Sequence, residues 1–250
     1  MRLASKLLLL ALALACACAF AFAAEAPPPP KQLRVLFIGN SLTSTGDIPA
    51  RFARLADAMG RKATVEMVAF PDYGLEDHWR DGRALEAIRK KSWDVVVLQH
   101  SSSTKPESQA ELVEYTKRFA KPIREAGAKP ALYMVWPSVD KVREFNSLIV
   151  GHRAAAESVD AILLPVGEAW LRAMGEDKRL KLYGDTIHPN SLGQDLAVLT
   201  IYLTLFPAGQ YEFDEIFVAK AAKALELPPD RRDAFFDAAT RAIDEPLAVK

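Results

Sequence analysis

The most regular feature of the chain is a set of five short apolar segments rich in strand-forming residues. They lie at residues 33–38, 63–70, 93–99, 130–136 and 160–166. Hydrophobicity within them is nearly continuous, most clearly at Val95–Leu98 and Ile162–Leu164. Strands of this kind are covered on both faces, which is typical of parallel sheets. The pattern therefore predicts a mostly parallel, five-stranded sheet.

Apolar residues at helical spacing separate these segments. Three such groups are Ile48, Phe52, Leu55 and Met59; Leu112, Thr116, Phe119 and Ile123; and Val142, Phe145, Ile149 and Val159. Gly60 and Gly127 follow the first two groups, where helices commonly stop. The alternation of strands and helices predicts a three-layer α/β domain with right-handed crossovers over residues 33–206.

The last part of the chain has a different pattern. A helix that begins at Ser191, with Gln194 completing a capping box, is apolar on almost every side and should be buried. From Pro207 the pattern becomes amphipathic, and Asp230 stands where a helix cap is expected. We interpret residues 207–250 as a C-terminal helical extension that packs on the same domain.

The first residues have the features of a secretory signal peptide. Arg2 and Lys6 precede an apolar stretch over residues 7–22, and Ala21–Ala23 forms a cleavage site of small residues. We therefore expect a signal peptide over residues 1–23, a Pro-rich spacer over 24–32, and a secreted or periplasmic mature protein.

A lipid anchor is the alternative for this segment, because Cys16 and Cys18 lie in it. It is less favoured, since alanine rather than leucine stands three residues before each cysteine. Cleavage after Ala23 would remove both cysteines, leaving neither a disulfide nor a thiol nucleophile.

Charge and motifs exclude several classes of partner. Lys and Arg total 32, as do Asp and Glu, so no net charge attracts nucleic acid. After the signal segment no apolar run approaches 18 residues, so stable membrane insertion of the mature chain is not expected. The sequence also lacks a P-loop and an HExxH motif. It predicts neither a cofactor nor a metal site, and the oligomeric state stays open.

Residues able to do chemistry follow the strands, at the sheet edge where open α/β sheets bind ligands. Ser41 follows the first strand, and "YGDTIHPNSLG" places Asp185 and His188 three residues apart. A serine hydroxyl becomes nucleophilic when a histidine takes its proton and a carboxylate orients that histidine. The sequence therefore predicts a triad of Ser41, His188 and Asp185.

The same edge offers hydrogen-bond donors for an oxyanion. We expect the backbone N–H groups of Ser41 and Gly74 and the side-chain amide of Gln99 to form the oxyanion hole. Asn40 and His100 adjoin these residues and are candidates for lining the pocket.

These motifs resemble the four blocks of the SGNH (GDSL-like) hydrolase superfamily over about residues 33–205. The matching features are "GNSLT", the glycine after the second strand, the amide that ends the third, and "DTIHPN". The resemblance implies a flavodoxin-like α/β/α fold, the triad given above, and oxyanion donors at Ser41, Gly74 and Gln99. Two residues depart from the pattern: Asn40 replaces the usual aspartate, and Gln99 replaces the usual asparagine.

Several further residues have structural interpretations. His152 falls on an apolar helical stripe and should be a packed, hydrogen-bonded histidine. His78 should also occupy a structural helix position, and Asp72 or Asp77 could fix the loop of Gly74.

The function expected from the sequence is a secreted serine hydrolase that cleaves an ester through an acyl-enzyme. A small acyl group is favoured, such as acetyl on a carbohydrate or another small molecule. Two alternatives stay open. One is a non-catalytic carbohydrate-binding or envelope-assembly protein on the same fold, and the other is an acyltransferase that uses the same triad.

Overall fold

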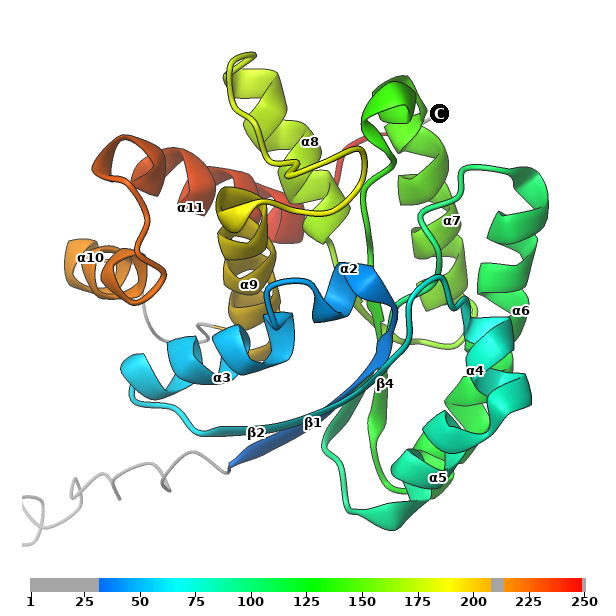
Figure 1. The fold of residues 1–250 in the computed structure, drawn as a ribbon. Coiled ribbons are helices and arrows are strands. Elements are labelled where there is room, and N and C mark those ends of the chain that lie inside the picture. The colour runs from blue at the N-terminus through cyan, green and yellow to red at the C-terminus, as the bar shows by residue number, and fades with distance from the viewer. Residues whose placement is uncertain (1–31, 208–213, 249–250) are drawn as a thin grey trace, which may run out of the picture. The chain divides into compact units, whose positions relative to one another are not determined.

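A computed structural model of the protein describes residues 32–207 and 214–248, and its five strands form one parallel sheet with the order β2-β1-β3-β4-β5 (Figure 1). The strands are β1 (Leu33–Gly39), β2 (Ala63–Ala69), β3 (Val95–Leu98), β4 (Lys129–Tyr133) and β5 (Ile162–Leu164). Each predicted apolar segment overlaps one of them, and every pairing is parallel, so the predicted sheet is confirmed. The expected signal peptide and nearly all of the spacer lie outside the described residues.

Helices flank the sheet. They are α2 (Ser41–Ser44), α3 (Ile48–Ala58), α4 (Leu75–Asp81), α5 (Arg83–Lys90), α6 (Pro106–Glu125), α7 (Phe145–Glu157), α8 (Val166–Glu176), α9 (Ser191–Leu205), α10 (Glu215–Ala224) and α11 (Pro229–Asp244), with a 3-10 helix η1 (Val139–Glu144). No helix in the described part of the chain is both long enough and apolar enough to cross a bilayer.

The two faces of the sheet bury alternate side chains of each strand. Val95 and Val97 of β3 face a core formed with α3, α8, α9 and α11. Val96 and Leu98 face the other core, formed with α4 to α7. Figure 1 shows these two sets of helices on opposite sides of the sheet. Because β3 is buried on both faces, its sequence is apolar at every position.

The strand order places a topological switch point at β1. β1 pairs with both β2 and β3, so the crossover from β1 to β2 and the crossover from β2 to β3 run in opposite directions along the sheet. Ligands of open α/β sheets bind beside the carboxyl ends of strands at such a switch point. Ser41 follows β1 and Gln99 follows β3, so both lie at this place.

Helix α9 begins at Ser191 as predicted, and it is buried along most of its length. The predicted capping box is wrong, because the cap is the preceding residue. Asn190 Oδ1 accepts a hydrogen bond of 3.0 Å from the N–H of Gly193. The Gln194 side chain instead donates to the carbonyl of Pro189 at 3.2 Å. The motif that contains Asp185 and His188 therefore also contains Asn190, the residue that caps α9.

Helices α10 and α11 pack on the same core as α3, α8 and α9. Phe235 and Ala239 of α11 are fully buried there. The chain after α11 is fastened to α8 by Glu168, whose side chain is 1% exposed. Glu168 accepts a hydrogen bond of 2.6 Å from the N–H of Leu247 and pairs with Arg153 at 2.6 Å.

Candidate functional site

The turn after β1 presents Ser41 at the start of a short helix. Asn40 has an extended backbone conformation and caps α2, since its Oδ1 accepts a hydrogen bond of 3.0 Å from the N–H of Leu42. Ser41 is the first residue of α2, where backbone N–H groups have no acceptor within the helix. The turn therefore offers both a hydroxyl and a backbone donor at one point.

The structure brings together the three side chains of the predicted triad. The Nε2 of His188 lies 2.9 Å from Oγ of Ser41. The Nδ1 of the same ring lies 2.7 Å from Oδ2 of Asp185. When Nδ1–H donates to the carboxylate, Nε2 is left to accept the hydroxyl proton. This is the arrangement that a serine nucleophile requires.

Asp185 is held by its own turn. Its Oδ1 accepts hydrogen bonds from the N–H groups of Ile187 at 2.8 Å and His188 at 2.7 Å. These two bonds, together with the bond from the His188 side chain, lower the pKa of Asp185 to about 2. The carboxylate is therefore charged at neutral pH, and the spacing Asp-x-x-His lets one turn hold both residues.

The triad is open to solvent. The side chain of His188 is 34% exposed and that of Asp185 is 54% exposed. The loop that carries them is nevertheless anchored, because the N–H of Val139 donates to the carbonyl of Thr186 at 2.8 Å.

Gly74 caps α4 next to the nucleophile turn. Asn40 Nδ2 donates to the carbonyl of Tyr73 at 2.9 Å and so joins the two loops. The N–H of Gly74, a predicted oxyanion donor, itself donates to Oδ2 of Asp77 at 2.9 Å. Asp77 thus fixes the Gly74 loop, as the sequence suggested for this residue.

Gln99, the third predicted donor, is fully buried. Its Oε1 accepts hydrogen bonds of 2.8 Å from the N–H of Asn40 and from Oγ1 of Thr43. Its Nε2 donates to the backbone carbonyl of His100. The side chain therefore turns its oxygen, not its nitrogen, toward the nucleophile turn.

His100 is buried behind the same loops, with 1% of its side chain exposed. Its Nδ1 accepts the N–H of Leu75 at 3.1 Å, and its Nε2 faces the carbonyl of Ser108 at 3.1 Å. Burial lowers the pKa of His100 to about 4, so the ring is neutral at pH 7. It joins the start of α4 to the start of α6.

One cluster of potential metal ligands at this place was not predicted from the sequence. Glu76, His100 and Glu111 bring carboxylate and imidazole ligand atoms within 4.8 Å of one another. They come from three separate elements, so no linear spacing marks them. Both nitrogens of His100 already have hydrogen-bond partners. Burial raises the pKa of the Glu76 carboxyl.

The remaining buried histidines have structural roles, as predicted. His78 lies in α4, and its Nε2 donates to the carbonyl of Gly39 at 2.8 Å. His152 lies in α7, and its Nδ1 donates to the carbonyl of Leu148 at 2.8 Å. Burial lowers the pKa of both rings.

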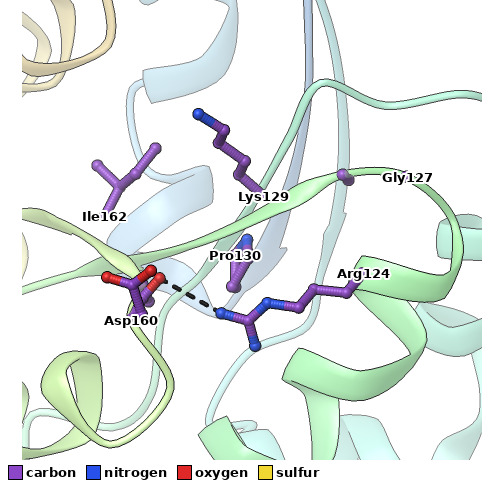
Figure 2. Close-up of a pocket in the computed structure, with 8 residues that line it drawn as sticks. Arg124, Gly127, Lys129, Pro130, Asp160 and Ile162 are labelled. Carbon is purple, nitrogen blue, oxygen red and sulfur yellow. Dashed lines mark hydrogen bonds between the residues drawn. The ribbon is translucent and has the colours of Figure 1, made fainter.

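A cavity of about 500 Å³ lies away from the triad, beside the first residues of β4 and β5 (Figure 2). Lys129 and Ile162 line it, together with Arg124, which donates to the carbonyl of Asp160 at 3.3 Å. Because it opens at the amino ends of the strands, it is separate from the candidate site.

Comparison with known proteins supports the fold. No protein-family model and no curated protein matched the chain. A candidate SGNH hydrolase from Slackia heliotrinireducens matches at a TM-score of 0.56 and 23% identity, over 70% of this chain and 99% of its own. A DUF4886 family protein from Bacteroides uniformis ATCC 8492 matches at a TM-score of 0.68 and 19% identity, over 88% and 97%.

The acetyl xylan esterase AlAXEase matches at a TM-score of 0.57 and 15% identity, over 68% of this chain and 98% of its own. The chain therefore has the fold of the SGNH (GDSL-like) hydrolases, which confirms the resemblance seen in its motifs. Similarity at these identities shows the fold alone.

Proposed function

We propose that the protein is a serine hydrolase that cleaves an ester through an acyl-enzyme. One observation carries the proposal: Ser41 Oγ, the His188 ring and Asp185 Oδ2 lie in one hydrogen-bonded line, with distances of 2.9 and 2.7 Å. A serine that only capped a helix would need neither an imidazole at hydrogen-bond distance nor a carboxylate behind it.

The reaction follows from this geometry. His188 Nε2 accepts the hydroxyl proton while Ser41 Oγ attacks the ester carbonyl. The tetrahedral intermediate collapses, the alcohol leaves with the proton from His188, and an acyl group stays on Ser41. His188 then removes a proton from water, which attacks the acyl-enzyme and releases the acid. Asp185 orients the ring and stabilises its protonated form throughout.

The N–H groups of Ser41 and Gly74 are the backbone donors proposed for the oxyanion. The Ser41 N–H belongs to the first turn of α2 and points out of the helix end. The Gly74 N–H is bonded to Asp77 before substrate arrives, so it would exchange that carboxylate for the oxyanion. The Asn40 bridge to Tyr73 keeps the two donors at a fixed separation.

For the substrate we propose a small acyl group on a larger alcohol, such as an acetylated carbohydrate. The open position of His188 and Asp185 supports a large alcohol. The likeness to the acetyl xylan esterase AlAXEase points to the same class. Because the N-terminal sequence has the features of a signal peptide, we also propose that the protein acts outside the cytoplasm.

Active-site labelling tests the proposal directly. A fluorophosphonate probe should label the folded wild-type protein and should not label Ser41→Ala. Hydrolysis should then be measured across acetylated sugars and aryl esters of increasing acyl length, with the highest kcat/KM expected for acetyl. Absence of both labelling and turnover in folded protein would identify a non-catalytic binding protein. Acyl transfer to an added sugar in preference to water would identify an acyltransferase.

A further inference from the structure

The nucleophile turn is held by a buried amide whose orientation is fixed by its neighbours. The N–H of Asn40 and the hydroxyl of Thr43 both lie 2.8 Å from the same atom of Gln99. A backbone N–H can only donate, so that atom must be the carbonyl oxygen. The other end of the amide faces the carbonyl of His100, which can only accept, so it must be the NH₂ group.

Burial limits what the amide can reach. Gln99 has no exposed surface, and Thr43 beside it is only 1% exposed. The NH₂ group donates to the carbonyl of His100, and no atom of Gln99 reaches the surface. An oxyanion donor has to meet the substrate oxygen at about 3 Å, in the space next to Ser41. The NH₂ group of Gln99 does not open into that space.

Other residues hold the same turn. His78 donates to the carbonyl of Gly39 at 2.8 Å. This carbonyl belongs to the same peptide as the N–H of Asn40, which donates to Gln99. A Cβ at Gly39 would collide with Gln99 Oε1 and Thr43 Oγ1, so a side chain there would displace the amide or the hydroxyl. The backbone on both sides of the Gly39–Asn40 peptide is thereby fixed before Ser41 begins.

We propose that Gln99 is a positioning residue that sets the direction of the Ser41 hydroxyl and is not a donor to the oxyanion. The inference rests on the proposed function and corrects the role expected from the sequence. Its functional atom is the carbonyl oxygen, which ties the residue before Ser41 to Thr43 in α2. Glutamine carries its amide one methylene farther from the backbone than asparagine does.

Substitutions of Thr43 distinguish the positioning role of Gln99 from an oxyanion role, because Thr43 hydrogen-bonds to the oxygen of the amide. Thr43→Val removes one of the two hydrogen bonds to Oε1 and leaves the NH₂ group untouched. We expect kcat for a small aryl acetate to fall roughly 3- to 10-fold, the effect of one lost hydrogen bond, while KM stays unchanged. Thr43→Ser keeps the hydroxyl and should restore kcat.

A matched control removes a similar bond elsewhere. Thr200 is also fully buried, and its Oγ1 donates to the carbonyl of Leu196 at 2.8 Å within α9. Thr200→Val should lower the melting temperature about as much as Thr43→Val but leave kcat at the wild-type value. A change in kcat that appears only in the Thr43 variant therefore reports on the nucleophile turn and not on general stability.

Gln99→Met completes a double-mutant cycle with Thr43→Val. If Gln99 is a positioning residue, Thr43→Val should not lower kcat further in a protein that already carries Gln99→Met, because the hydrogen bond between the two residues is already lost. If Gln99→Met alone lowers kcat by 10²-fold or more while Thr43→Val equals wild type, the amide acts as an oxyanion donor and the inference is overturned. If Gln99→Met fails to fold, the Thr43→Val and Thr43→Ser comparison decides alone. A wild-type protein that the fluorophosphonate does not label would overturn the proposed function itself, and the inference with it.

Discussion

The indole Nε1 of Trp136 donates a hydrogen bond of 2.8 Å to the backbone carbonyl of Ile187, the residue directly before His188. Trp136 is fully buried just after β4, where its ring stacks on Trp170 with a centroid separation of 3.7 Å and an angle of 3°. The loop of the proposed base is therefore fixed from the protein core, although the base itself is open to solvent.

Trp136→Phe should reduce turnover by misplacing His188. The substitution retains an aromatic ring but leaves the Ile187 carbonyl without its donor. We expect kcat for an aryl acetate to fall roughly 10-fold, because small displacements of a catalytic group are costly. Steady-state kinetics at matched folded fractions would measure this effect.

Trp170→Phe is the control for lost packing. Trp170 is also fully buried, and its Nε1 has no hydrogen-bond partner among the described residues. It should destabilise the protein to a similar extent but change kcat by less than about 2-fold, since the bond to Ile187 is kept. Equal losses of kcat in the two variants would show that packing, not this hydrogen bond, places the base.

The sheet and the grouping of the triad could be predicted from the sequence because both depend on strong local signals. Buried parallel strands such as Val95–Leu98 are apolar at every position. The carboxyl ends of parallel strands lie at one edge, which brings Ser41 near the loop of Asp185 and His188. These inferences need only the strand order along the chain and the chemistry of serine activation.

The direction of the Gln99 amide could not be predicted in this way. Composition and strand position place Gln99 at the site, but the partners of its two ends come from separate segments. The same holds for the Gly74 N–H, which a carboxylate three residues later accepts. Helix α5 was not predicted because it is short and half of its residues are charged, with only Ala84 and Ile88 buried.

Asn40→Asp should separate the two functions of Asn40. Aspartate can still cap α2 by accepting the N–H of Leu42, but a carboxylate cannot donate to the carbonyl of Tyr73. We expect the Gly74 loop to shift and kcat/KM to fall roughly 10-fold, the effect of a misplaced oxyanion donor. Urea denaturation should show a free energy of unfolding within about 1 kcal/mol of wild type, since the cap is retained. Unchanged kcat/KM would mean that the bridge is not needed.

Asp195 should make stability depend on pH. Burial, which outweighs the ion pair with Arg51, raises the pKa of this carboxyl to about 6. A folded pKa above the ordinary value of 3.8 means that the folded state binds the proton more tightly. Tighter binding of this proton in the folded state adds to the free energy of unfolding. The contribution is fully present below pH 3.8 and is lost as the pH rises through 6.

Asp195→Asn removes this titration while keeping the shape of the side chain. The free energy of unfolding of wild type, measured against that of Asp195→Asn, should therefore decline between pH 4 and pH 6.5. Urea denaturation at half-unit steps of pH would show the trend. If the difference in unfolding free energy between wild type and Asp195→Asn stays constant from pH 4 to pH 6.5, the pKa of Asp195 is not raised in the folded state. This holds whichever of the two proteins is the more stable.

Glu168 should be a main support of the C-terminal extension. It is 1% exposed and faces Arg153 at 2.6 Å and Arg172 at 3.3 Å, while also accepting the N–H of Leu247. Glu168→Ala leaves two cations without their carboxylate and should cost about 3–5 kcal/mol in the free energy of unfolding. Asp237→Ala breaks the exposed pair with Arg241 and should cost less than about 1 kcal/mol. Glu168 contacts no member of the triad, so kcat of the folded fraction should stay at the wild-type value in both variants. Similar losses of unfolding free energy in the two variants would show that the burial of Glu168 adds nothing to stability.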